Sequence, residues 1–154
     1  MKSMLLLLAT LALGACIVVA EDSTHAGPSR ARRVVNAQGR NDSLPFSHGV
    51  LAGDTFYVAG TLGLDPATGQ PPADAREEVR LLIESFRDKL RLVGMDMEDL
   101  VSVQVFCPDL ELYETFNEVY ATYFDRDYPA RAFLGSGPLL RGCRFEINGV
   151  AVRR

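Results

Sequence analysis

The sequence predicts an α+β domain in which two helices cover one face of a mixed, six-stranded sheet. The predicted order of elements is β-β-β-α-β-α-β-β, and strands that alternate with helices favour a single mixed sheet. The chain has 154 residues and is 47% hydrophobic, so it is long enough for one domain with a substantial core.

The first predicted helix is the most regular segment of the chain. Asp74 is its expected N-cap, with Glu77 as the capping-box partner. Gly94 follows the helix as the expected C′ residue. The apolar residues recur at helical spacing on one stripe, which comprises Ala75, Val79, Leu82, Ile83, Phe86, Leu90 and Val93.

The remaining elements follow from alternation and from turn residues. Residues 101–107 alternate strictly between valine or cysteine and other residues, which predicts a strand with its Val/Cys face toward the helices. Asp109 can cap a second helix. Shorter strands are predicted at 33–35, 49–52 and 55–59, the last two joined by a tight turn at Gly53-Asp54.

Residues 129–147 predict a hairpin, because two alternating segments flank a turn rich in glycine and proline. The last strand is expected to run on to about Val152. The sheet face without helices is expected to carry a polar set comprising Gln104, Arg131, Arg144, Glu146 and Asn148. Such a face has little left in the chain to cover it, so we expect it to be an interface between subunits.

Arg131 and Glu146 are the candidate functional pair. As an exposed cross-strand ion pair they would contribute about 0–1 kcal/mol to stability. As a site, the planar guanidinium would bind a carboxylate and the glutamate would position water or move a proton. The residues alone leave both interpretations open.

The first 20 residues resemble an export signal, since Lys2 is their only charge and the apolar run is too short to span a bilayer comfortably. Two processing sites compete. Cleavage after Ala20 would release a soluble exported protein, which we favour, whereas a lipobox-like run ending at Cys16 would give a lipoprotein; an uncleaved anchor is a third alternative. We therefore expect a signal peptide at 1–20, a flexible lead-in at 21–32 and one domain at 33–154.

Other chemistry is disfavoured by the sequence. The net charge of −4 and the absence of a basic stripe argue against a nucleic-acid surface. No group of histidines and carboxylates has metal-ligand spacing. Cys107 and Cys143 are either a disulfide, if the two strand ends meet in an oxidising compartment, or two buried thiols.

Several motifs in order resemble the Rid family, the reactive intermediate deaminases. The signature is Pro129-Ala130-Arg131 followed by Glu146-Ile147. Further matches are Pro45-Phe46-Ser47, Val58 to Gly63, Asp65 to Gly69, Asn117 to Tyr120 and Ala151 to Arg154. The resemblance covers about residues 33–154, the whole predicted domain.

The resemblance implies a chorismate-mutase-like fold, a homotrimer with sites between subunits, and hydrolysis of 2-imino or enamine acids such as 2-iminobutanoate and 2-iminopropanoate to 2-keto acids and ammonia. It implies no metal or organic cofactor and no membrane contact unless Cys16 is lipidated. Arg131 matches the carboxylate-binding arginine and Glu146 the glutamate that holds the attacking water. Gly60 and Asn117 match positions that line the cleft.

The chain departs from the family pattern at four positions. Phe46 stands where tyrosine is frequent, and Phe133 where cysteine is frequent; both would line the substrate site. Thr61 replaces a frequent glutamine, and Phe145 replaces an aliphatic residue. These changes leave an alternative function, a non-catalytic module that binds carboxylate ligands in the same cleft. Some relatives are described as ribonucleases, which the acidic charge disfavours here.

Overall fold

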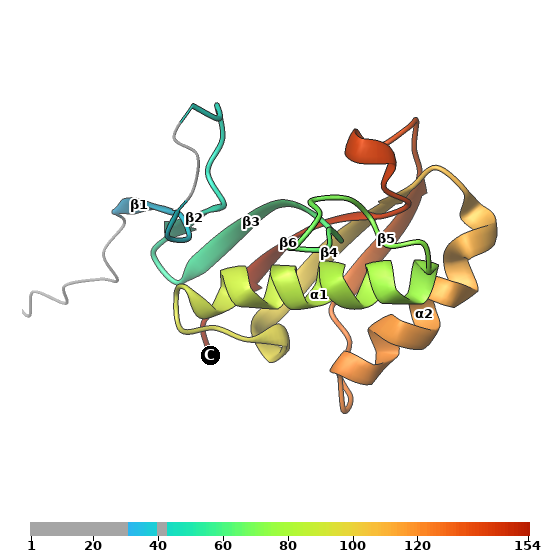
Figure 1. Cartoon of the computed structure of the whole chain (residues 1–154). Helices are drawn as coiled ribbons and strands as arrows, with labels where there is room; N and C mark the ends of the chain where they lie inside the picture. Colours follow the sequence, from blue (N-terminus) through green and yellow to red (C-terminus); the bar gives the residue numbers. More distant parts are fainter. Residues whose placement is uncertain (1–30, 40–42) are drawn as a thin grey trace, which may run out of the picture.

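The computed structural model describes residues 31–39 and 43–154 (Figure 1). The predicted signal peptide at 1–20 and nearly all of the lead-in at 21–32 lie outside these residues. None of the described helices has the length and apolar character needed to cross a bilayer.

The described chain forms one mixed sheet with both helices on the same face, as predicted (Figure 1). Its six strands follow the order β1-β2-β3-β6-β4-β5, and only the β4–β5 pair is parallel. The strands are β1 (Arg32–Val35), β2 (Gly49–Ala52), β3 (Thr55–Leu62), β4 (Leu100–Cys107), β5 (Ala130–Gly135) and β6 (Glu146–Val152). The helices are α1 (Ala75–Arg91) and α2 (Tyr113–Tyr120), with short 3₁₀ turns at Met97–Asp99, Leu110–Leu112, Ala121–Tyr123 and Leu140–Gly142.

Helix α1 forms where its apolar stripe predicts. The Asp74 carboxylate accepts a hydrogen bond from the Arg76 amide at 2.9 Å, which satisfies one of the free donors of the first turn. Glu77 pairs with Arg80 instead of closing a capping box. Gly94 has a φ of 71°, a conformation that glycine adopts without strain, and it ends the helix.

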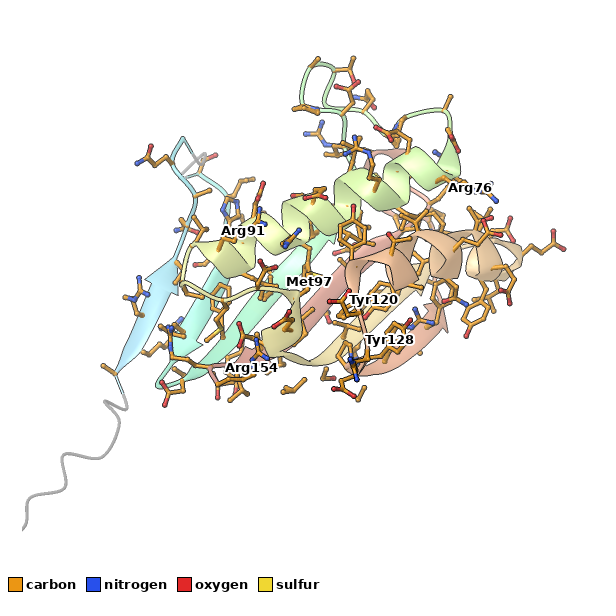
Figure 2. The ribbon with its side chains drawn as sticks, turned by 90° about the horizontal axis from the view of Figure 1, so that it is seen from below. Arg76, Arg91, Met97, Tyr120, Tyr128 and Arg154 are labelled. Carbon is orange, nitrogen blue, oxygen red and sulfur yellow. The ribbon has the colours of Figure 1, made fainter. Side chains whose placement is uncertain are left out.

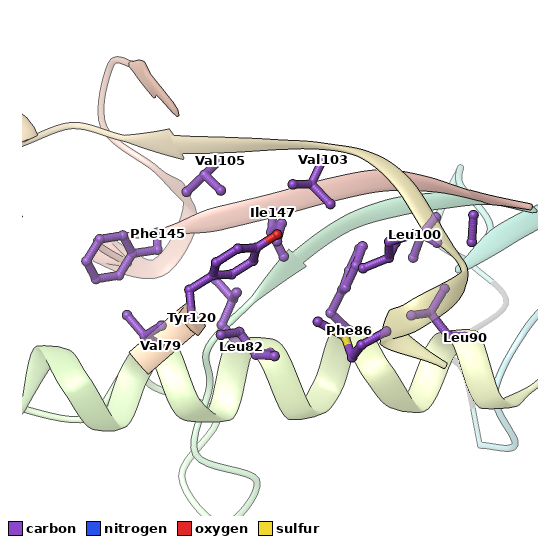
Figure 3. Close-up of a cluster of buried hydrophobic side chains, with 14 of the residues drawn as sticks. Val79, Leu82, Phe86, Leu90, Leu100, Val103, Val105, Tyr120, Phe145 and Ile147 are labelled. Atoms are coloured by element: carbon purple, nitrogen blue, oxygen red, sulfur yellow. The ribbon is translucent and has the colours of Figure 1, made fainter. Parts of the chain in front are cut away.

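The core lies between the sheet and α1 (Figure 3). The helix contributes its stripe, and β4 and β6 contribute alternate residues. The fully buried side chains of this layer include Val79, Leu82, Phe86, Leu90, Val105, Phe145 and Ile147. An irregularity between Leu100 and Ser102 of β4 turns Val101 outward, so this valine is 47% exposed and the predicted Val/Cys face begins at Val103.

The predicted hairpin between residues 129 and 147 is wrong. Strand β5 and strand β6 do not pair, because β4 lies between them and bonds to both. The segment rich in glycine and proline that connects them is a crossing loop, and it contains a 3₁₀ turn with positive φ at Arg141 (59°) and Gly142 (72°).

The expected polar face is also partly wrong. Gln104 and Asn148 face each other across β4 and β6 on the helix-free face, and Glu146 shares it. Arg131 instead lies opposite Val103, a buried residue that faces the helices. Arg144 precedes β6 and turns toward the first turn of α1.

Candidate active site

Arg131 lies at the edge of the sheet, between β5 and α2. Its guanidinium donates a hydrogen bond of 2.6 Å to Oδ1 of Asn117 on α2. Four aromatic rings surround the guanidinium carbon at 4.8–6.0 Å, those of Tyr113, Phe116, Tyr120 and Phe133. Among the described residues no carboxylate forms an ion pair with Arg131. The rings orient this cation by cation–π contact and leave its charge available to an anion.

A cavity of about 420 Å³ opens beside Arg131. We call it the Arg131 cavity; it is lined by Asn117, Tyr120, Ala121, Tyr128, Pro129 and Arg131. Figure 2 shows Tyr120 and Tyr128 close together beside α2. The volume suits a small organic acid, and the single charged lining residue is a cation.

The Tyr120 hydroxyl is a buried polar group without a hydrogen-bond partner among the described residues. Burial raises the pKa of Tyr120 to about 12, against an opposing effect of the nearby Arg131 charge. The hydroxyl therefore stays protonated at neutral pH, and it is a donor that neighbouring protein atoms do not use.

Glu146 opens strand β6 on the helix-free face. It lies opposite Leu62 of β3 and Phe106 of β4, and its side chain extends over Gly60. A Cβ at position 60 would stand 3.2 Å from the carboxyl carbon of Glu146 and well inside contact distance of its Oε1. Glycine is therefore required at position 60 for the carboxylate to lie in this place.

A buried carboxylate anchors the two residues that precede Glu146 in the chain. Glu78 of α1 is fully buried, and its Oε1 accepts the amides of Arg144 at 2.7 Å and Phe145 at 3.2 Å. Its Oε2 accepts Nε of Arg144 at 2.6 Å, and the Arg144 guanidinium also donates to the carbonyls of Pro72 and Ala73. Charge and hydrogen bonds thus compensate the burial of Glu78 and fix the start of β6.

Arg131 and Glu146 lie on opposite faces of the sheet within one chain. Strand β4 separates them, with Val103 opposite Arg131 and Phe106 opposite Glu146. Because side chains alternate along a strand, residues three apart point to opposite faces. A single chain therefore presents two separate candidate clusters, which we call half-sites: the Arg131 cavity and the Glu146–Gly60 pair.

The predicted site residues divide between these halves. Asn117 joins Arg131, and Phe133 packs nearby, with its ring 5.1 Å from that of Tyr113 in an edge-on contact. Gly60 joins Glu146. Phe46 is 51% exposed on the segment before β2, and it does not line the Arg131 cavity.

Sequence reasoning missed two cavity residues, Tyr120 and Tyr128. Tyr120 is a buried residue of α2, and a hydroxyl on a buried helix face is a signal that sequence reasoning could have used. Cys107 and Cys143 are free thiols, and burial raises the pKa of each, that of Cys143 to about 11. Within residues 31–39 and 43–154 no cluster of three or more His, Cys, Asp or Glu residues could hold a metal ion.

The fold and the Arg131 cavity define an α+β protein in which Arg131, without a carboxylate partner among the described residues, can hold a small anion. Known proteins share this fold. Residues 40–153 match the family described as endoribonuclease L-PSP. The 2-iminobutanoate/2-iminopropanoate deaminase of Bos taurus is 36% identical over 110 residues, which cover 71% of this chain and 80% of that protein. The human protein of the same name is 32% identical over 127 residues, 81% of this chain and 93% of that protein.

A solved structure shows the same architecture. Escherichia coli TdcF with bound serine superposes with a TM-score of 0.73 at 29% identity, over 79% of this chain and 99% of that chain. The chain belongs to the endoribonuclease L-PSP family and, within it, to the Rid proteins. This confirms the family resemblance and the chorismate-mutase-like fold.

Proposed function

We propose that this protein is an exported imine/enamine deaminase that hydrolyses 2-imino acids to 2-keto acids and ammonia. The observation that carries the proposal is the Arg131 guanidinium, which lines a cavity and has no carboxylate partner among the described residues. The deaminase names of the relatives support the same reaction class.

In this mechanism Arg131 binds the substrate carboxylate, and Asn117 fixes the plane of the guanidinium. The imine carbon is already electrophilic, so the site has to hold water in attack position and move protons. Glu146 takes a proton from that water and returns one to the nitrogen that leaves as ammonia. All atoms of the reaction come from substrate and water.

The position of the two half-sites supports a homotrimer with active sites between subunits. Arg131 of one subunit would meet Glu146 of its neighbour, because one chain holds these side chains on opposite faces of its sheet. The helix-free face, with Tyr57 53% exposed and Val101 47% exposed, supplies apolar surface for such an assembly.

The first experiment measures keto-acid release from imino acids that an amino-acid oxidase generates in place. We expect the purified protein to accelerate release above spontaneous hydrolysis, and Arg131→Ala to abolish the acceleration. No acceleration with small, branched and aromatic imino acids would disprove the deaminase function.

A second experiment tests the shared site. Arg131→Ala and Glu146→Gln should each be inactive alone, yet a refolded equimolar mixture should recover activity in about one quarter of its sites, because each intact site takes one residue from each variant. A mixture without activity, in confirmed mixed trimers, would contradict the intersubunit arrangement.

The alternative is a binding module without turnover. Phe133 favours it, because its ring packs beside Arg131 and brings no polar group to the site. Keto acids would then bind with micromolar to millimolar affinity, and Arg131→Ala would lose binding while wild type showed no catalysis.

Mass spectrometry of the mature N-terminus tests the proposed export. A diacylglyceryl mass on Cys16 would show that the protein is a lipoprotein and would contradict the soluble exported form.

A further inference from the structure

Strand β3 contains a bulge next to the Glu146 half-site. The pairing with β6 steps from Val58–Gly149 to Thr61–Ile147, so β3 advances three residues while β6 advances two. One extra residue therefore stands in β3 around Ala59 and Gly60. Bulges leave backbone groups outside the regular ladder, and such groups need other partners.

Lys89, in the last turn of α1, supplies one of these partners. Its ammonium donates to the Gly60 carbonyl at 3.2 Å and to Oγ1 of Thr61 at 2.7 Å. Thr61 is buried, with 3% of its surface exposed. Its hydroxyl in turn donates to the Ala59 carbonyl at 3.1 Å. One cation thus joins the three consecutive residues of the bulge to the helix.

The same bulge supports the candidate catalytic carboxylate. Gly60 lies directly beneath the Glu146 side chain, without room for a Cβ between them. Burial lowers the pKa of Lys89 to about 8, and the negative charge of Glu146 opposes this shift. Lys89 and Glu146 therefore interact electrostatically from the two sides of the bulge.

We propose that Lys89 is a positioning residue for Glu146, which it serves by holding the β3 bulge so that Gly60 stays beneath the carboxylate. The inference rests on the proposed function, since it gives Lys89 a part in the same reaction. Lys89 acts through Gly60 and Thr61 and binds no substrate atom. Thr61, where the family frequently has glutamine, is short enough to leave space for the ammonium.

The test variant is Lys89→Met, which keeps the apolar stem of the side chain and removes the charge and the donors. We expect kcat to fall about tenfold, because the carboxylate and its water lose their fixed geometry. KM should change less than about twofold, because Arg131 still holds the substrate carboxylate. Arg80→Met is the matched control: it removes another cation of α1, whose partner Glu77 lies on the same helix.

A second variant tests the route of the effect. Thr61→Val removes the hydroxyl at nearly constant shape. The double variant combines Thr61→Val with Lys89→Met. If Lys89 acts through the bulge, this double variant should lose about as much kcat as Lys89→Met alone, since both substitutions break the same hydrogen-bond network. Losses that multiply, or a rise in KM with kcat unchanged, would overturn the proposal.

A measurement without turnover separates this inference from the proposed function. Amide hydrogen exchange at Gly60 and Thr61 should be about tenfold faster in Lys89→Met than in wild type, with β4 unchanged. Unchanged exchange at the bulge would refute the role of Lys89 even in an active enzyme. An inactive wild type with faster exchange in the variant would refute the deaminase function and keep the structural role of Lys89.

Discussion

Replacing Gly60 with alanine should disable Glu146 while leaving the fold intact. The new Cβ would stand 3.2 Å from the Glu146 carboxyl carbon and closer to Oε1. An ordinary contact begins near 3.4 Å, and Oε1 lies far inside that distance. The carboxylate must therefore move by roughly 1 Å to clear the new Cβ from Oε1, and a displacement of that size costs about 100-fold in rate. The backbone of Gly60 does not have the positive φ that disfavours alanine, so the substitution adds no backbone strain.

The assay for Gly60→Ala is steady-state keto-acid release, with unfolding midpoints measured in parallel. We expect kcat to fall about 100-fold and the midpoint to stay close to that of wild type. Gly137→Ala is the matched control, because a Cβ at position 137 would meet no atom within 4 Å. If Gly60→Ala retained wild-type kcat, the carboxylate position in this structure could not be the catalytic one.

Three further predictions concern charged groups. Arg131→Lys should raise KM about tenfold in the same assay, because an ammonium lacks the planar fork that binds a carboxylate bidentately; unchanged KM would contradict carboxylate binding. Arg144→Ala should lower the free energy of unfolding by about 3 kcal/mol in urea titrations, since it leaves the fully buried Glu78 unpaired, whereas Arg76→Ala at an exposed ion pair should cost under about 1 kcal/mol. The pKa of Lys89 is lowered by burial from 10.5 to about 8, so the unfolded chain binds more protons between these values. The free energy of unfolding of wild type relative to Lys89→Met should therefore rise as the pH increases from about 8 to about 10.5, and a flat difference would contradict the burial of Lys89.

Local patterns predicted the elements and their order. The stripe from Ala75 to Val93 specifies α1 because helical packing requires apolar residues at that spacing. Gly53, with a φ of 59°, makes the tight turn between β2 and β3 that the sequence indicates. Each of these features is decided by residues close together in the chain.

Strand order was not predictable in the same way. Nothing in residues 129–147 indicates that β4, which ends at Cys107, lies between the last two strands. Once β5 pairs in parallel with β4, the face of Arg131 follows from its register with Val103 and not from the alternation of β5 alone. The contact of Glu78 with Arg144, 66 residues apart, is equally invisible to local patterns.

The family signature nevertheless indicated the residues of both half-sites. Arg131 and Asn117 meet in the structure, as do Gly60 and Glu146. The signature could not indicate Lys89, because Thr61, which accepts the Lys89 hydrogen bond, departs from the family pattern.

Strand β6 completes the sheet from its middle, between β3 and β4, although it is the last strand in the chain. Until residues 146–152 have been synthesised, β3 and β4 lack the strand that lies between them, and the buried face of α1 has no complete sheet to pack against. During synthesis the domain should therefore remain loosely structured until its final strand leaves the ribosome. A chain that folds so late would stay unfolded enough to be translocated through a secretion channel, which is compatible with the export that we propose.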